Sequence, residues 1–172
     1  NILVDAAGNP KVLDFGVARV TADEAQRSIQ TDVGQLIGTL AYMSPEQIAA
    51  NPDDIDTRTD VYALGVILYE LLTGTLPHRV EGRLIHEITR TICEEQPSRI
   101  SKLDRSLSGD LDTIVAKAME KDRARRYQSA VELASDLRRF LANEPIVARP
   151  PSTSYQLRKL AQRNRPLVAG VV

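Results

Sequence analysis

The sequence predicts a mostly α-helical domain with one small β-hairpin at its N-terminal edge. From Asp60 to about residue 141, apolar residues recur at helical spacing, whereas short β-prone runs occur close to the N-terminus. Hydrophobic residues make up 42% of the 172 residues and charged residues 26%, which is typical of a soluble globular chain. These observations predict a helical bundle with a small β element.

The hairpin is predicted from Ile2-Leu3-Val4 and Val12-Leu13, which are joined by a turn-forming segment. Gly8 and Asn9 in that segment tolerate positive φ, so the turn can be tight. Residues 16–58 show no sustained period. They predict a long loop with a short helix at residues 46–50.

Four helices are predicted after the loop. In residues 61–72 only Gly65 and Glu70 are not apolar, which predicts a helix that is buried on all sides and ends near Gly74. Three amphipathic helices follow at residues 84–92, 111–119 and 130–141. Ser129 and Glu132 form a predicted capping box for the last of them.

Charge divides the chain into an acidic body and a basic tail. Residues 145–172 hold five basic and no acidic side chains, which leaves 17 basic and 23 acidic ones in residues 1–144, a net charge of −6. We expect residues 142–166 to be a Pro-rich basic linker that resists packing. Residues 167–172 are all apolar or Gly and are interpreted as the start of a single transmembrane helix. The chain begins without Met in a predicted strand, so we expect it to belong to a longer protein.

Composition disfavours several classes of site. One Cys excludes a disulfide framework within the chain, and two His leave little for a zinc centre. Seven aromatic residues and an acidic body disfavour nucleic-acid binding. Residues 53–56, Asp-Asp-Ile-Asp, lack the Gly and Glu of an EF-hand and are better explained as a polar loop. Cys93 lies beside Ile92 on an apolar face and is predicted to be a small core residue.

Asp14-Phe15-Gly16 directly follows the second predicted strand. Such an Asp can direct its carboxylate out of the hairpin, and the hairpin would bring the Asn1 amide oxygen close to it. Both are hard oxygen ligands of the kind that Mg²⁺ prefers. A turn Asp that merely caps the loop explains Asp14 equally well.

Further motifs occur in a fixed order. They are Gly-Thr-Leu-Ala-Tyr-Met-Ser-Pro-Glu at 38–46, Asp-Val-Tyr-Ala-Leu-Gly at 60–65 and Lys-Asp-Arg-Ala-Arg-Arg-Tyr at 121–127. Together with residues 14–16, they resemble the C-terminal lobe of a eukaryotic-like (Hanks-type) bacterial serine/threonine protein kinase. The resemblance covers about residues 1–141.

The resemblance implies roles at the hairpin and the loop after it. Asn1 would be the last residue of the catalytic loop and, with Asp14, would bind Mg²⁺ at the ATP phosphates. Phe15 and Gly16 would complete the Asp-Phe-Gly motif, in which the Phe position distinguishes active from inactive states. Residues 14–46 would form the activation segment, where Ser28 and Thr31 are candidate phosphorylation sites.

Four further residues receive roles from the resemblance. Thr39 would lie in the substrate-binding loop. Glu46, in a Ser-Pro-Glu that stands where Ala-Pro-Glu is usual, is expected to pair with Arg126. Asp60 would accept backbone hydrogen bonds from the catalytic loop, a role compatible with a simpler one as a helix N-cap.

The resemblance implies an enzyme that transfers the ATP γ-phosphate to Ser or Thr of protein substrates with Mg²⁺, its kinase domain on the cytoplasmic side of a membrane. The catalytic base is expected upstream of Asn1, and the N-lobe elements that hold ATP are absent from these 172 residues, so the chain alone is expected to be inactive. The alternative is a pseudokinase or protein-interaction module without phosphoryl transfer.

Overall fold

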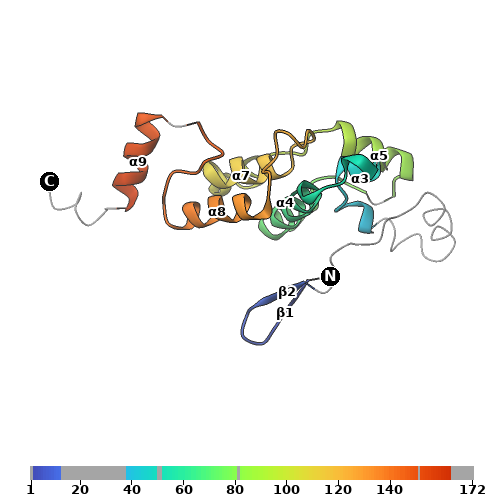
Figure 1. The fold of residues 1–172 in the computed structure, drawn as a ribbon, viewed down its shortest axis with the longest axis horizontal. Helices are drawn as coiled ribbons and strands as arrows, with labels where there is room; N and C mark the ends of the chain where they lie inside the picture. The colour runs from blue at the N-terminus through green and yellow to red at the C-terminus, as the bar shows by residue number, and fades with distance from the viewer. Residues whose placement is uncertain (1, 13–37, 50–51, 81, 151, 164–172) are drawn as a thin grey trace. The chain divides into compact units, whose positions relative to one another are not determined.

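The computed structural model describes residues 2–12, 38–49, 52–80, 82–150 and 152–163. The chain divides into two compact units, residues 1–33 and residues 34–172, which are described separately. The first contains the β-hairpin, and the second contains all of the described helices (Figure 1).

The hairpin consists of β1 (Ile2–Val4) and β2 (Pro10–Val12), paired antiparallel with Ile2 opposite Val12. The Asp5 carboxylate closes the turn, because its Oδ1 accepts the backbone N–H of Ala7 at 3.0 Å and of Asn9 at 2.9 Å. Gly8 has φ +83°, which a residue without Cβ adopts freely. The predicted hairpin is therefore present, with a second strand that begins at Pro10.

The second unit is helical, as predicted from the apolar spacing. The predicted helices at 84–92, 111–119 and 130–141 correspond to α5, α7 and α8. In chain order the elements are α3 (Pro45–Ile48), the 3₁₀ turn η1 (Pro52–Asp54), α4 (Thr57–Thr73), α5 (Ile85–Glu94), α6 (Ile100–Leu103), the 3₁₀ turn η2 (Arg105–Leu107), α7 (Asp110–Ala118), α8 (Ala130–Leu141) and α9 (Thr153–Arg163).

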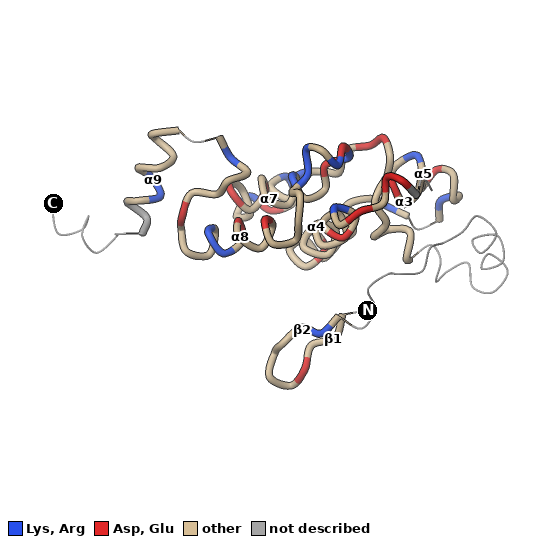
Figure 2. Tube along the Cα trace, viewed as in Figure 1, with Lys and Arg blue, Asp and Glu red and all other residues tan. Residues whose placement is uncertain are grey.

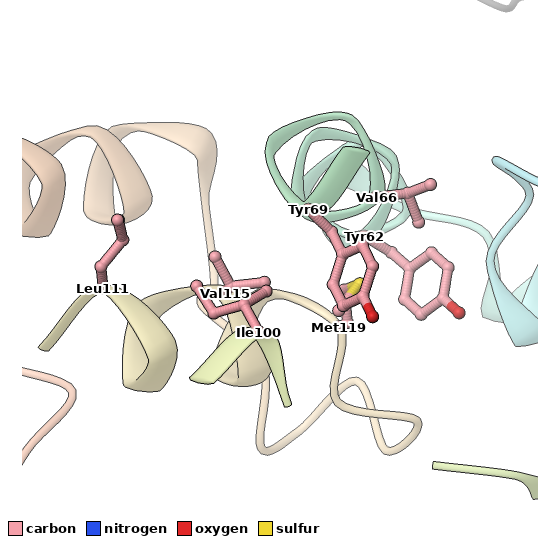
Figure 3. Packing of buried hydrophobic residues seen from close by; sticks show 7 residues of the cluster. All are labelled: Tyr62, Val66, Tyr69, Ile100, Leu111, Val115 and Met119. Carbon is pink, nitrogen blue, oxygen red and sulfur yellow. The ribbon is translucent and has the colours of Figure 1, made fainter. Parts of the chain in front are cut away.

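The main core forms where α4 packs against α6 and α7. Figure 3 labels the residues of this cluster: Tyr62, Val66 and Tyr69 of α4, Ile100 of α6, Leu111 and Val115 of α7, and Met119. Gly65 permits the close approach, because a Cβ at this position would lie 2.9 Å from both Ala118 Cβ and Met119 Cγ. The apolar run that predicted α4 thus provides one wall of the core.

Two expectations about α4 are wrong. The helix is not buried on all sides, since Leu71 is 78% exposed and Leu64 37% exposed. Among the described elements α6, α7 and α8 cover one side of α4, and Leu64 and Leu71 lie on its uncovered side. The helix also begins before Asp60. Its N-cap is Asp56, whose side chain accepts the Arg58 N–H at 2.8 Å, so Asp60 lies exposed in the first turn and is not the cap.

The prediction that residues 142–166 resist packing is also wrong for the part of this segment that the structure describes. Ile146 is only 3% exposed and packs in a second core cluster with Val61, Ile114 and Leu133. Residues 153–163 form α9, although Pro150 and Pro151 precede it. An extended, Pro-rich segment can pack when its apolar side chains and its backbone N–H groups both find partners.

Basic and acidic residues are mixed along the helical unit, and α9 carries basic residues (Figure 2). Within the described ranges, none of the helices combines the length and apolar character that crossing a bilayer requires. The apolar residues 167–172 lie outside these ranges.

Candidate functional site

The site begins at the loop that leads into α3. Tyr42 N–H donates to Thr39 O and Met43 N–H to Leu40 O, both at 3.1 Å, which turns the chain toward α3. Ser44 is fully buried and caps α3 through a capping box with Gln47, in which each side chain bonds the backbone N–H of the other residue. The same turn places the Glu46 side chain toward the interior, while Thr39 stays exposed.

Glu46 forms a buried ion pair with Arg126. The guanidinium Nη1 and Nη2 donate to the two carboxylate oxygens at 2.7 and 3.0 Å, a bidentate arrangement. The Arg126 side chain is fully buried and that of Glu46 is 8% exposed. Thr59 Oγ1 donates to the same carboxylate at 3.2 Å. The pair therefore connects the loop at 38–46 to the segment that precedes α8.

Every N–H of the Arg126 guanidinium has an acceptor. Nε donates to Glu120 O at 2.9 Å, Nη1 also donates to Arg58 O at 2.8 Å, and Nη2 also donates to Lys121 O at 3.2 Å. The guanidinium also lies over the Tyr62 ring, with Cζ 5.2 Å from its centroid. Such complete pairing offsets much of the cost of burying a charge.

The electrostatics follow from this pairing. Burial raises the pKa of the Glu46 carboxyl. The hydrogen bonds and the charge of Arg126 lower this pKa by more than burial raises it, so the net pKa lies below its ordinary value. Glu46 thus stays ionised in the folded protein at neutral pH.

Lys121 is a second, half-buried cation beside the pair, and no sequence pattern predicted its surroundings. Its Nζ donates to Ile92 O at 2.7 Å and to Tyr62 Oη at 3.2 Å, and it lies 3.0 Å from His78 Nε2. Burial lowers the Lys121 pKa to about 8. Burial, with the Lys121 charge second, lowers the His78 pKa to about 4, so His78 is neutral at pH 7.

Two of the three acidic residues at 53–56 form ion pairs with arginines. Asp54 pairs with Arg123, and Asp56 pairs with Arg58 in addition to capping α4. The interpretation of this stretch as a polar loop agrees with these contacts. Across the described ranges, His, Cys, Asp and Glu form no group of three or more that could hold a metal ion.

The predicted site residues fall into two groups. The structure brings Glu46 and Arg126 together, leaves Thr39 exposed in the preceding loop, and places Asp60 on the exposed face of the first turn of α4. The others, Asn1, Asp14, Phe15, Gly16, Ser28 and Thr31, lie outside the described residues. Sequence reasoning missed His78 as a buried partner, because a His after Pro77 has no pattern that predicts burial.

Comparison with known proteins identifies the class. Residues 1–137 match the family model described as "Protein kinase domain". The chain therefore belongs to the protein kinase family, and its buried Glu46–Arg126 pair lies inside the matched region. Within the family it is similar to bacterial serine/threonine kinases of the Hanks type.

Three relatives illustrate the similarity. Serine/threonine-protein kinase PknB of Mycobacterium tuberculosis is 41% identical over 145 residues, covering 84% of this chain and 22% of the relative. A probable serine/threonine-protein kinase of Corynebacterium efficiens is 40% identical over 141 residues, which cover 80% of this chain and 20% of the relative. Another from Streptomyces coelicolor is 36% identical over 148 residues, covering 86% and 21%. The chain thus spans about a fifth of the length of these curated relatives.

Proposed function

We propose that the protein containing this chain transfers the γ-phosphate of ATP to Ser or Thr hydroxyls of protein substrates. The observation that carries the proposal is the bidentate Glu46–Arg126 pair, which fixes the loop at 38–46 on the helical unit of a protein kinase family member. Phosphoryl transfer depends mainly on positioning and on stabilising charge, so a firmly held substrate loop serves this chemistry.

Asn1 and Asp14 are proposed as Mg²⁺ ligands, with Phe15 and Gly16 completing the motif. Their carboxylate and amide oxygens suit this ion. The hairpin register supports a shared site for Asn1 and Asp14. Ile2 lies opposite Val12, so the chain enters β1 and leaves β2 at the same end of the hairpin. Asn1 directly precedes Ile2, and Asp14 follows Val12 by two positions. Mg²⁺ bound there would neutralise negative charge on the ATP phosphates.

The exposed Thr39 is proposed to contact the substrate side of the site, and Asp60 to accept hydrogen bonds from the catalytic loop. Ser28 and Thr31 are proposed phosphorylation sites in the activation segment, residues 14–46. A phosphate there adds negative charge that can order the segment against basic partners. Mass spectrometry of the active full-length enzyme tests this, and detection of both residues unmodified would contradict it.

The test of the main proposal uses the full-length protein with labelled ATP, Mg²⁺ and a generic protein substrate. We expect Ser and Thr phosphorylation that Asp14→Asn abolishes and that Thr39→Val reduces. Residues 1–172 alone should transfer no phosphate, because the proposed base lies upstream of Asn1. Transfer by residues 1–172 alone would contradict this assignment.

The alternative is a pseudokinase or interaction module that binds partners without chemistry. The presence of Asn and Asp at positions 1 and 14 favours the enzyme, since a module without chemistry has no need of the two Mg²⁺ ligands. If the full-length protein shows no transfer with Mg²⁺ and ATP, the module is the better description.

Membrane attachment is proposed separately. It rests on the basic residues between 145 and 166 and the apolar run at 167–172, with a kinase domain (residues 1–141) on the cytoplasmic side. Fractionation of cells that express the full-length protein tests it. Recovery in the membrane pellet after a carbonate wash supports the proposal, and recovery in the supernatant contradicts it.

A further inference from the structure

The family match ends at residue 137, yet the described chain continues to residue 163 and returns to the helical unit. Two buried carboxylates bind this returning part of the chain. Asp136 of α8 is 1% exposed and Asp110, the first residue of α7, is 7% exposed. Carboxylates are rarely buried unless their oxygens are fully paired. The groups that bond Asp136 and Asp110 therefore show which parts of the chain each carboxylate attaches.

Asp136 holds the extended segment after α8. Its Oδ1 accepts the Val147 N–H at 2.7 Å, and its Oδ2 accepts the Ala148 N–H at 2.8 Å and the Tyr127 hydroxyl at 2.9 Å. Ile146, next to these two residues, is buried in the second core cluster. We call this attachment the inner clamp. In it the Asp136 carboxylate accepts backbone N–H groups of the segment and forms no ion pair with a described basic residue of the segment.

Asp110 holds α9 through charged and polar side chains. Its Oδ2 accepts the Tyr155 hydroxyl at 2.9 Å and pairs with Lys159 Nζ at 2.7 Å, while its Oδ1 pairs with Arg149 at 3.2 Å. Tyr155 and Lys159 are four residues apart, so they lie on one face of α9. Both are buried, at 9% and 8% exposure. We call this attachment the outer latch.

The two attachments differ in what holds them. The inner clamp consists of hydrogen bonds to backbone N–H groups beside a buried apolar side chain, whereas the outer latch depends on cations that meet one buried carboxylate. One contact links them: Tyr155 Oη accepts the Ile146 N–H at 3.0 Å, so opening the latch leaves this buried N–H without its acceptor. That cost favours the closed state while the charges are intact.

We propose that residues 145–150 and 152–163 form a strap with two separable attachments, in which the inner clamp stays closed and the outer latch releases α9 when the charge of Asp110 or Lys159 is removed. When the latch is closed, α9 fixes the direction in which the chain leaves the helical unit. When it opens, that direction becomes free from Arg149 onward. The strap is independent of phosphoryl transfer.

The test measures amide hydrogen exchange in the full chain by NMR, residue by residue over 145–149 and 152–163, so that Ile146, whose acceptor is Tyr155 of the latch, is read separately from Val147 and Ala148. Lys159→Gln is compared with Arg158→Gln, which removes the same charge from the neighbouring, exposed position of α9. We expect Lys159→Gln and Asp110→Asn to raise exchange in α9 by about tenfold or more, as local opening does. Exchange at Val147, Ala148 and α4 should stay unchanged, and Arg158→Gln should change nothing.

Asp136→Asn removes the inner clamp and should raise exchange at Val147 and Ala148, whereas α9 keeps its contacts with Asp110 and should exchange less than in Lys159→Gln. Unchanged protection of α4 shows that each variant remains folded. If Asp136→Asn unfolds the protein, Asp110→Asn and Lys159→Gln still test whether the outer latch opens by itself. The proposal is overturned if Lys159→Gln affects α9 no more than Arg158→Gln. It is equally overturned if opening of α9 always releases Val147 and Ala148, because the strap would then be a single unit.

Discussion

Arg126 and Glu46, which are eighty positions apart in the sequence, meet as a bidentate ion pair with N–O distances of 2.7 and 3.0 Å. The guanidinium also donates to three backbone carbonyls, those of Arg58, Glu120 and Lys121. One side chain thus connects α3, the start of α4 and the segment before α8. Its removal affects three elements at once.

We therefore expect Arg126→Gln to lower the free energy of unfolding by about 3–5 kcal/mol, the usual cost of removing one partner of a buried pair. Thermal or urea unfolding measures the change. Arg125→Gln is the matched control, because it removes the same charge from an adjacent exposed side chain and should cost less than about 0.5 kcal/mol. Equal effects of the two substitutions would contradict a special role for Arg126.

The ionised state of Glu46 gives the pair a pH dependence. The folded pKa of Glu46 lies below its ordinary value of 4.5, so the carboxylate contributes stability above that value and loses it as the pH falls through the folded pKa. The difference in unfolding free energy between the wild type and Glu46→Gln should be largest above about pH 4.5. It should shrink under more acidic conditions. Urea unfolding from pH 6 to pH 3 checks this, and a difference that grows with acid would refute it.

Burial and the Lys121 charge lower the His78 pKa to about 4. Because this folded pKa is below that of the unfolded chain, His78 lowers stability as the pH falls from about 6.5 toward 4. Lys121→Met removes the nearby charge, so the His78 pKa should rise, although burial should keep it below 6.5. An NMR titration of the His78 ring measures both values. Lys102→Met, an exposed lysine of α6, is the control and should leave the titration unchanged.

The contact at Gly65 predicts an overpacked variant. Gly65→Ala adds a Cβ at 2.9 Å from Ala118 Cβ and Met119 Cγ, and at 3.2 Å from the Ala118 backbone carbon. Despite the helix propensity of Ala, we expect a net loss of about 1–3 kcal/mol in unfolding free energy. Adding Ala118→Gly makes room for the new methyl group, so the double variant should lose less than the sum of the two single losses. Strict additivity in urea unfolding would exclude the steric cause.

The hairpin and α5, α7 and α8 were predictable because each has a local pattern. Gly8 and Asn9 indicate a turn between two β-prone runs, and the apolar residues of α8 repeat at helical spacing after the capping residue Ser129. The resemblance of three ordered motifs to protein kinases was equally local, and the family match confirms it.

Other features depended on partners distant in the sequence. Leu71 is exposed because the described helices cover the other side of α4. His78 is buried beside Lys121, which is 43 positions away in the sequence. No local pattern distinguishes these outcomes.

The sequence by itself determined the helical class, the hairpin and the kinase family, and it named candidate site residues whose roles remain predictions. Only the tertiary structure decided that the described residues between 145 and 163 pack against the helical unit. The composition of this segment, rich in Pro and basic residues, predicted an unpacked linker. Its packing depends on two carboxylates, Asp110 and Asp136, whose burial and pairing exist only once α7 and α8 have folded.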